Sequence, residues 1–278
     1  MSKINCQTEY DPLLEVILCE PTHMRIEEAI NLTQAYYKEA NINREIAVRQ
    51  HQTFVNSLRS HQIRVQLLPA HPTFQEQVFT RDIGFTIENT LYVASLKREI
   101  RQGEQLVLKE ELQKMNLSYQ ECLGGTIEGG DVILGEHCLY VGESSRTSRG
   151  SVSQLQNAYP KRCIEMIAFD DEYLHLDCVF NPISADTALI YREAIEEESV
   201  KLLEQQYKLI DVTKEEQFTL ATNVLSIGYN KVFCLPQNVQ ANTKLREAGY
   251  TTIEVDLSEI IKSGGSFRCI TLPVRRKK

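Results

Sequence analysis

The stretch Asp82-Ile-Gly-Phe-Thr-Ile-Glu-Asn-Thr-Leu-Tyr-Val93 contains the pattern that decides the fold. A carboxylate opens it, an apolar strand follows, a polar turn at Glu88-Asn89 reverses the chain, and a second apolar strand completes it. The same order returns in three further stretches, which open at Asp131, Asp177 and Asn223. A recurring unit of strands and a helix predicts an array whose copies occupy equivalent places. Four polar side chains would then meet near one axis.

The copies repeat at a nearly regular interval of roughly 43 to 50 residues, a length typical of ring architectures. The interval is measured between equivalent apolar positions at Leu91, Leu139, Leu189 and Val232. A strand at Leu13–Cys19 and a last strand at Phe267–Leu272 lie outside the four copies, and together they would complete a fifth unit and close the ring. An ordinary α/β sandwich with similar hairpins is the alternative. No low-complexity linker divides residues 1–278, so we expect one domain.

The segments between these strands carry helical and strand-like apolar spacing. Helices are predicted over about 26–39, 44–60, 104–115, 196–206 and 239–248, with a short one beginning near 151, and further strands over 64–68, 163–168 and 251–255.

The composition indicates a soluble globular protein. Hydrophobic residues make up 42% of the 278 residues, and the net charge of -8 argues against a nucleic-acid-binding surface. No stretch approaches the roughly 20 apolar residues that span a bilayer, and the first residues show no signal-peptide core. We therefore expect a cytoplasmic protein without nucleic-acid or membrane partners.

The 8 cysteines are scattered and form no Cys-x-x-Cys pair. In a reducing compartment most of them are expected to be small buried hydrophobic side chains, and the spacing disfavours a zinc site. One cysteine has a distinctive setting, because Cys269 follows the pair Gly264-Gly265 and has Arg268 beside it. The glycines allow unusual backbone angles, and the arginine could stabilise a thiolate. A strand cysteine after a glycine turn is the alternative.

Several acids and one histidine suit chemistry on a cation. His175 and Asp177 would point to the same face of a strand, which suits general acid–base chemistry, although a surface histidine fits the pattern equally. Glu128 lies among four glycines in a loop without the Lys-Ser/Thr of a phosphate loop, and such acids suit a cationic ligand. Asp82 adds another acid, with a turn cap as its alternative role.

Two arginines follow the first two hairpins. Arg101 ends the run 97–101, and Arg146 lies in the run 144–149. An arginine can bind a substrate carboxylate with two parallel hydrogen bonds, whereas a solvated charged loop is the plainer interpretation of each.

The order of these motifs resembles the guanidine-modifying enzyme superfamily. The motifs are Phe-x-Arg-Asp, Glu-Gly-Gly-Asp, His-Leu-Asp and a cysteine after Gly-Gly. This superfamily includes the arginine deiminases, the dimethylarginine dimethylaminohydrolases and the amidinotransferases, and the chain length is most similar to the dimethylarginine hydrolases. The resemblance extends from Leu13 to Cys269. It implies a pentein fold, a five-bladed α/β propeller with pseudo-fivefold repeats, as a single catalytic domain.

The resemblance also implies roles for individual residues. Cys269 would be the nucleophile, His175 the general acid and base, and Glu128 the residue that holds both the histidine and the substrate guanidinium. The residues implied to bind substrate are Asp82 and Asp177 at the guanidinium, and Arg101 and Arg146 at the α-carboxylate.

The implied reaction is hydrolysis of a guanidine C–N bond of arginine or a methylated arginine. The products are a ureido compound, citrulline, and ammonia or an amine, and the route passes through a covalent thiouronium on the cysteine. The implied partner is a small guanidino substrate, no metal or organic cofactor is needed, and the protein is expected to be a monomer or a homodimer.

Two residues depart from the patterns of the resembled groups. Asp177 stands where a lysine is expected in the dimethylarginine hydrolases, as it does in the deiminases. A second carboxylate favours a guanidine with free N–H donors, because an unpaired buried carboxylate is costly. This predicts an unmethylated substrate. Arg268 differs from the histidine that precedes the nucleophile in deiminases and amidinotransferases.

Three alternatives follow from the same resemblance. They are arginine deiminase-type activity on unmethylated arginine, amidino transfer to an amine, and a binding protein that shares the propeller without catalysis.

Overall fold

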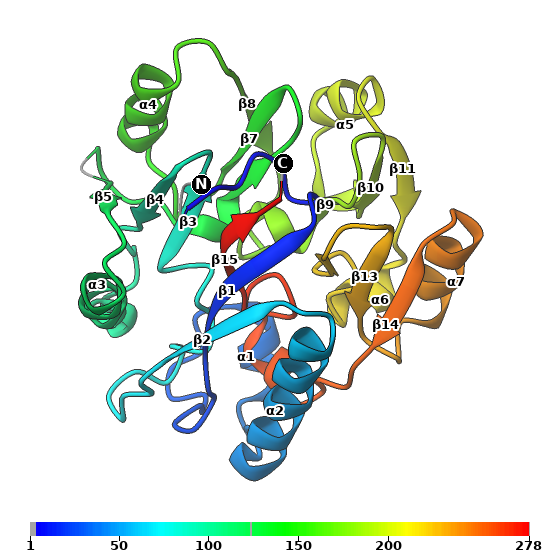
Figure 1. The fold of residues 1–278 in the computed structure, drawn as a ribbon. Coiled ribbons are helices and arrows are strands. Elements are labelled where there is room, and N and C mark those ends of the chain that lie inside the picture. The colour runs from blue at the N-terminus through cyan, green and yellow to red at the C-terminus, as the bar shows by residue number, and fades with distance from the viewer. Residues whose placement is uncertain (1–3, 123, 278) are drawn as a thin grey trace.

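The computed structural model describes residues 4–122 and 124–277, whose strands and helices are arranged around a common centre (Figure 1). These residues form five sheets of three strands. In each sheet two antiparallel strands are joined by a third, which lies parallel to the middle strand. This arrangement confirms the predicted five-bladed α/β propeller.

The first four sheets follow one another along the chain. The first contains β3 (Gly84–Ile87), β4 (Thr90–Val93) and β5 (Tyr119–Glu121), with α3 (Glu104–Lys114) before β5. The second contains β6 (Val132–Leu134), β7 (Cys138–Glu143) and β8 (Cys163–Ala168), with α4 (Arg149–Ala158) before β8. The third contains β9 (Phe180–Pro182), β10 (Thr187–Ile190) and β11 (Lys208–Asp211), with α5 (Glu197–Glu204) before β11. The fourth contains β12 (Leu225–Ser226), β13 (Lys231–Cys234) and β14 (Thr251–Glu254), with α6 (Lys214–Phe218) before β12 and α7 (Val239–Glu247) before β14.

The fifth sheet joins the two ends of the chain. Its middle strand β1 (Leu13–Cys19) pairs antiparallel with β15 (Leu272–Arg276) and parallel with β2 (Arg64–Leu68). The helices α1 (Leu32–Tyr37) and α2 (Arg44–Ser60) lie between β1 and β2 in the sequence, and β1 and β15 lie side by side in Figure 1. The last strand of the chain therefore occupies the place that the first hairpin strand has in the other sheets.

Two predicted elements are wrong in extent. The helix predicted over 26–39 is reduced to α1, because the Asn31 side chain caps it by accepting a hydrogen bond from Gln34 N, and Ile30 N donates to the Gln34 side chain instead of entering a helical ladder. The strand predicted at Phe267–Leu272 is mostly a turn, in which Ile270 N donates to Ser266 O, and β15 begins at the residue where the predicted strand ends. The predicted bounds of β1, β2, β8 and α2 are confirmed.

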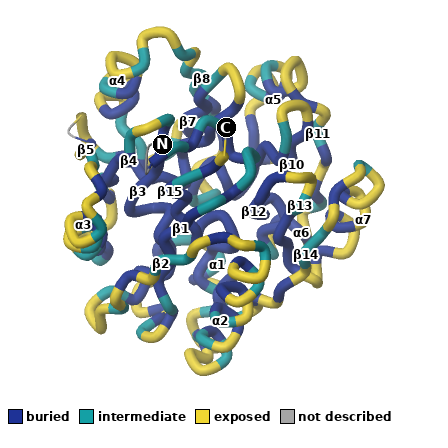
Figure 2. Tube along the Cα trace, in the orientation of Figure 1, coloured by how far each residue is buried: buried dark blue, intermediate teal, exposed yellow. Residues whose placement is uncertain are grey.

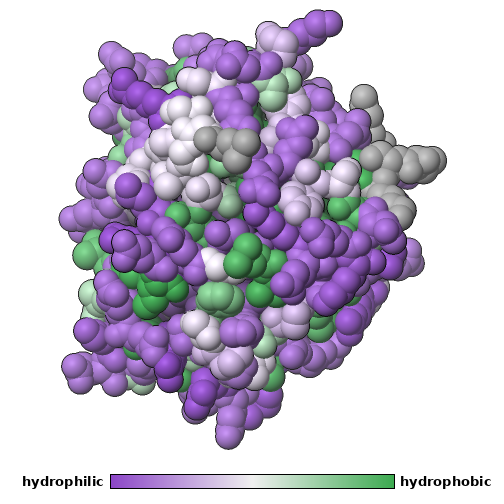
Figure 3. All heavy atoms as spheres, turned by 90° about the vertical axis from the view of Figure 1, so that its left-hand side faces the viewer, coloured by the Kyte–Doolittle hydropathy of each residue, from purple (hydrophilic) through white to green (hydrophobic). Residues whose placement is uncertain are grey.

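The core lies between the sheets and the helices that surround them. Figure 2 shows buried strands in the interior and exposed outer sides of the helices, and α2 buries Ala47, Phe54 and Leu58 completely. On the face turned to the viewer in Figure 3, hydrophilic residues cover most of the surface and apolar residues form small patches. Within the described residues, no helix has the length and apolar character needed to cross a membrane.

Candidate active site

The polar residues that open the repeats lie at equivalent places, just before the first strand of each sheet. Asp82, Asp131, Asp177 and Asn223 are all buried, with exposures of 1%, 0%, 0% and 0%. Cys269 stands in the same place before β15 and is 2% exposed. Cys269 is therefore the fifth of these opening residues, of which the sequence pattern identified four.

Hydrogen bonds connect each opening segment to the next and close a ring. The bonds run from Gly129 N to Asp82 O (3.4 Å), Leu176 N to Asp131 Oδ1 (3.0 Å), Asn223 Nδ2 to Asp177 O (3.1 Å), Cys269 N to Asn223 Oδ1 (3.1 Å) and Arg81 N to Cys269 O (3.0 Å). Because these bonds satisfy buried backbone and side-chain groups, they hold the five openings together around the axis.

His175 and Glu128 form a close polar pair in the site. The histidine Nε2 lies 2.7 Å from Glu128 Oε2, and both side chains are fully buried. A Cβ atom at Gly130 would lie 2.6 Å from His175 Nδ1, so the glycine of the predicted acidic loop makes room for the ring. His175 itself is extended, but Leu176–Cys178 is a 3-10 turn, so the prediction that His175 and Asp177 lie on one face of a strand is wrong.

Each residue of this pair stabilises the charged form of the other. Burial alone would lower the pKa of His175, but Asp82, Glu128 and Asp131 raise it above its usual range. Burial alone would raise the pKa of Glu128, but His175 and Arg146 lower it. The histidine is therefore a cation in the resting site, ready to donate a proton.

Asp82 faces the same space as this pair. Its Oδ2 accepts a hydrogen bond from Arg101 Nη1 at 2.5 Å. Its Oδ1 and His175 Nδ1 form an ion pair at 3.6 Å, and neither atom makes a hydrogen bond to any residue that the structure describes. Buried polar atoms without partners are uncommon. Two such atoms next to each other mark a place where a ligand with N–H donors and an acceptor would fit.

Both predicted carboxylate-binding arginines lie within the site, but their guanidinium groups are already engaged. Arg101 is 1% exposed and pairs with Glu104 at 2.8 Å as well as with Asp82. Arg146 Nη1 lies 3.1 Å from Glu128 Oε2, and its Nη2 donates to Ile30 O at 3.5 Å. In this arrangement each arginine neutralises a carboxylate of the site.

Asp131 supports the loop that carries Arg146. Its Oδ2 accepts hydrogen bonds from the Ser144 and Thr147 hydroxyl groups, the latter at 2.6 Å, while its Oδ1 accepts from Leu176 N beside His175. Burial raises its pKa to about 6. One carboxyl group thus orders both the arginine loop and the histidine backbone.

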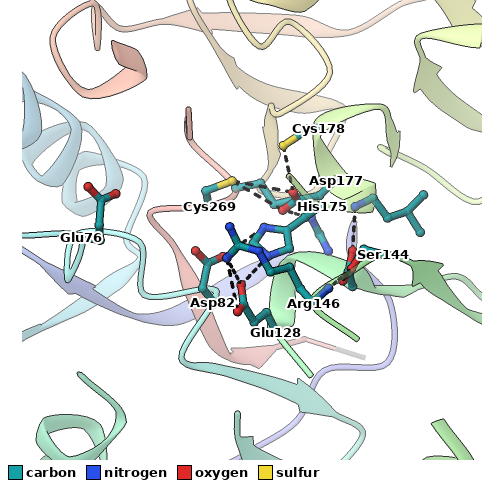
Figure 4. A network of polar contacts seen from close by, with 12 residues as sticks. Glu76, Asp82, Glu128, Ser144, Arg146, His175, Asp177, Cys178 and Cys269 are labelled. Atoms are coloured by element: carbon teal, nitrogen blue, oxygen red, sulfur yellow. Dashed lines mark hydrogen bonds and ion pairs between the residues drawn. The ribbon is translucent and has the colours of Figure 1, made fainter. Parts of the chain in front are cut away.

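The thiol of Cys269 lies between an amide and a carboxylate. Asn223 Nδ2 donates to its Sγ at 3.1 Å, and Asp177 Oδ1 and Oδ2 lie 3.7 and 3.8 Å away. Figure 4 shows Asp82, Glu128 and His175 gathered on one side of this group, with Cys178 beyond Asp177. The contact with Cys178, burial and the charge of Asp177 raise the pKa of Cys269 well above the usual range. These causes favour the thiol form of Cys269 in the resting site.

Arg268 forms ion pairs with two buried acids near the thiol. Its Nε lies 3.2 Å from Asp177 Oδ2, and its Nη1 pairs with Glu9, which also accepts hydrogen bonds from Arg81 at 2.7 and 2.8 Å. Sequence reasoning did not identify Glu9 or the role of Asn223. The repeats identify Asn223 as the fourth opener without indicating its role, and no local pattern distinguishes Glu9.

Three side chains of the site have ligand atoms close enough together to bind a cation. One ligand atom from each of Asp82, Glu128 and His175 lies within 4.8 Å of the others, a spacing that a metal ion or the nitrogen atoms of a flat organic cation could use. The two acids meet a protonated histidine, and Asp82 Oδ1 is free of hydrogen bonds, a combination that suits an N–H donor.

The fold and the site together define the class of this protein. A five-bladed α/β propeller that brings a thiol, an imidazole and several carboxylates to its axis is a member of the guanidine-modifying superfamily. The family model described as "N,N dimethylarginine dimethylhydrolase, eukaryotic" matches residues 20–276, and the chain belongs to this family.

Relatives and solved structures agree with this family. The uncharacterized protein YkgA of Bacillus subtilis (strain 168) is 48% identical over 274 residues, which are 99% of this chain and 96% of the relative. The N(G),N(G)-dimethylarginine dimethylaminohydrolase of Pseudomonas aeruginosa is 26% identical, with 81% and 87% covered. The solved N-terminal domain of ArgZ, described as an arginine dihydrolase in cyanobacteria, is 24% identical and superposes with a TM-score of 0.86 over 96% of this chain and 98% of that chain, which shows the same fold.

Proposed function

We propose that this protein is a hydrolase that cleaves a guanidine C–N bond of arginine or a methylated arginine, giving citrulline and ammonia or an amine. One observation carries the proposal. Asp82 Oδ1 and His175 Nδ1, which make no hydrogen bond to a described residue, face each other as an ion pair at 3.6 Å in a buried acidic site that also contains the Cys269 thiol. Family membership and the names of the relatives support the same reaction class.

Substrate binding requires an exchange of guanidinium groups. Arg101 and Arg146 now pair with Asp82 and Glu128, the carboxylates that a substrate guanidinium would take. We propose that the incoming guanidinium replaces Arg146 at Glu128, and that the released arginine binds the substrate α-carboxylate with two hydrogen bonds. The buried acids then keep a cationic partner throughout, which avoids the cost of an uncompensated buried charge.

The substrate also activates the nucleophile. The resting thiol has a raised pKa because it contacts Cys178, is buried and lies beside Asp177. A guanidinium cation placed beside the sulfur opposes the last of these causes and favours the thiolate. Cys269 therefore releases its proton to solvent and becomes a strong nucleophile when the reacting carbon is present.

The reaction then has two halves. The thiolate attacks the guanidinium carbon, and protonated His175 donates its proton to the departing amine or ammonia as the C–N bond breaks. A thiouronium on Cys269 remains. His175, now neutral, takes a proton from water, and the resulting hydroxide adds to the same carbon. The C–S bond then breaks as the hydroxyl proton of the adduct passes to the leaving sulfur, which releases the ureido product and restores the Cys269 thiol.

Asp177 favours a substrate with free N–H groups. Its Oδ2 is paired with Arg268, but its Oδ1 faces the sulfur atoms of Cys269 and Cys178 at 3.7 and 3.8 Å, and thiols are weak donors. A guanidinium N–H would satisfy this oxygen better, and methylation removes such a donor. We therefore propose unmethylated arginine as the preferred substrate.

A substrate panel tests the function. Arginine, methylarginine, dimethylarginine and agmatine are incubated with the protein, and citrulline, ammonia and methylamines are measured. Much faster turnover of dimethylarginine than of arginine would overturn the inference from Asp177. A new guanidine formed from an added amine would mean amidino transfer, and normal turnover by Cys269→Ser would exclude the covalent route.

A further inference from the structure

A second thiol lies next to the proposed nucleophile. One ligand atom from each of Asp177, Cys178 and Cys269 lies within 4.8 Å of the others, and Asp177 Oδ1 lies 3.8 Å from Cys178 Sγ and 3.7 Å from Cys269 Sγ. The two cysteines come from different blades, Cys178 from the 3-10 turn Leu176–Cys178 and Cys269 from the turn before β15. Both side chains are buried, so the pair is held inside the protein fold.

The two thiols differ in their access to a nearby pocket. This pocket has a volume of about 200 Å³, and its lining includes Cys178 and the apolar side chains of Leu174, Phe218 and Leu220. Cys269 is not among the lining residues. Phe218 is 38% exposed, so the pocket opens at the surface of the described structure. Cys178 therefore stands between the pocket and the nucleophile.

We propose that Cys178 is a modification site at which a small, uncharged organic disulfide entering this pocket begins the oxidation of Cys178 and Cys269 to an internal disulfide. The apolar part of the lining, which Leu174, Phe218 and Leu220 provide, suits a short organic disulfide, and Cys178 is the cysteine that such a molecule meets. The proposal rests on the proposed function in one respect, because the bond stops catalysis only if Cys269 is the nucleophile.

The chemistry takes two exchange steps. The Cys178 thiolate attacks one sulfur of R–S–S–R, so that a Cys178–S–S–R bond forms and one RS⁻ leaves and takes up a proton. The Cys269 thiolate then attacks Cys178 Sγ, and the second RS⁻ leaves in the same way. Two protein thiols are oxidised to one disulfide, and one R–S–S–R is reduced to two RSH.

The geometry requires a local movement. A disulfide has a sulfur–sulfur distance of about 2.05 Å, so rotation of the two side chains must bring the sulfur atoms closer. The bonds that hold Cys269 N and Ser266 N to Asn223 Oδ1 can stay intact, because only the side chain turns. The raised pKa of Cys269 slows the second step, so we expect a mixed disulfide on Cys178 to appear first.

The test uses the full-length reduced protein carrying Cys163→Ser, which removes an exposed thiol. The protein is treated with bis(2-hydroxyethyl) disulfide and digested without reduction, and the peptides are identified by mass. We expect a mixed disulfide at Cys178, followed by a linked pair of peptides containing Cys178 and Cys269. Complete modification of Cys178 without that link, or no modification of Cys178, would overturn the proposal.

Two further variants distinguish inactivation that depends on Cys178 from inactivation through other thiols. Each protein's remaining activity is compared with that of its own untreated sample. Cys178→Ser is expected to lose activity at least about fivefold more slowly than its parent, because the reagent can no longer form a mixed disulfide beside the proposed nucleophile. Cys234→Ser, which removes a buried thiol in the fourth blade, should behave like the parent, and dithiothreitol should restore activity. Equal inactivation of Cys178→Ser and its parent would contradict the proposal.

The mapping needs no substrate. If the substrate panel shows no turnover, the peptide masses still decide whether the Cys178–Cys269 bond forms.

Discussion

The side chain of Asn223 holds Cys269 at two points. Its Nδ2 donates to the cysteine Sγ at 3.1 Å, and its Oδ1 accepts the backbone N–H of the same residue at 3.1 Å. The same Oδ1 accepts from Ser266 N at 3.2 Å. Since the thiol lies in a turn, this amide replaces the support that a strand or helix would give.

Replacing Asn223 with alanine should therefore impair both catalysis and stability. The change leaves two buried N–H groups unpaired, each of which costs about 1–3 kcal/mol of unfolding free energy, and the freed thiol should lower kcat by roughly 100-fold. Asn181→Ala is the matched control, because Asn181 Nδ2 donates to Thr222 O and Val224 O, both at 2.8 Å, without touching the thiol. Urea unfolding and kcat are measured for both. Equal losses of kcat in the two variants would show that the contact with sulfur has no specific role.

A methyl group at Gly130 should displace the His175 imidazole. A Cβ there would lie 2.6 Å from His175 Nδ1, so the ring must leave its present position. We expect Gly130→Ala to reduce kcat by about 100-fold or more, since small misplacements of catalytic groups have large effects. Gly249→Ala is the control. Gly249 has a φ of 90°, and a Cβ at this position would meet no atom within 4 Å, so this change adds only backbone strain. Near-normal kcat in Gly130→Ala would contradict the assigned position of His175.

Glu9 should be important for stability although it lies far from the catalytic residues in sequence. It pairs with the buried Arg81 and Arg268, and both arginines help to lower its pKa to about 2 even though burial alone would raise it. Removing one partner of a buried ion pair costs about 3–5 kcal/mol, which we expect for Glu9→Gln in urea unfolding. Glu15→Gln, which removes pairs with the partly exposed Arg64 and Arg275, each at the long distance of 3.6 Å, should cost less than about 1 kcal/mol. Similar losses in the two variants would count against the buried network.

The lowered pKa of Glu128 predicts a change in acid stability. Burial opposes the shift, but His175 and Arg146 lower the folded-state pKa below its unfolded value of about 4.3. The carboxylate therefore contributes stability that is present above about pH 4.3 and is lost as the pH falls through the folded pKa. Glu128→Gln should reduce the slope of unfolding free energy between about pH 4.3 and 3 by up to about 1.4 kcal/mol per pH unit.

The titration of His175 lies above this window because its pKa is raised. Glu197→Gln, at a glutamate whose side chain is 82% exposed, should leave the slope of the parent protein unchanged. If the slopes of Glu128→Gln and the parent coincide, the ion pair with His175 is not formed in solution.

The repeats allowed the ring to be predicted from sequence because strand, turn and strand are local patterns. The turn at Tyr229-Asn230, for example, has φ angles of 55° and 54°, as a tight hairpin requires. The bounds of β1, β2, β8 and α2 were also readable from apolar spacing. The sequence further named the residues that converge, since Cys269, His175, Glu128, Asp82 and Asp177 all lie buried at the centre.

The remaining features depend on contacts between distant segments. The turn around Cys269 was predicted as a strand because its apolar residues suggest one, but hydrogen bonds from Asn223 override that preference. The ion pair between Arg146 and Glu128 could not be predicted from sequence, because it requires two loops of one blade to meet beside His175. Glu9 acts through Arg268 near the opposite end of the chain, and no spacing within the sequence relates them.

The fifth blade has a consequence for the order in which the molecule is assembled. Four blades can form from continuous stretches of chain, whereas this one waits until β15 meets β1. Contacts between segments so far apart in sequence are slow to form, and we expect them to be among the last. The turn with Cys269 immediately precedes β15, and Glu9 lies shortly before β1. A growing chain would therefore lack the complete proposed active site around Cys269 until the fifth blade has formed.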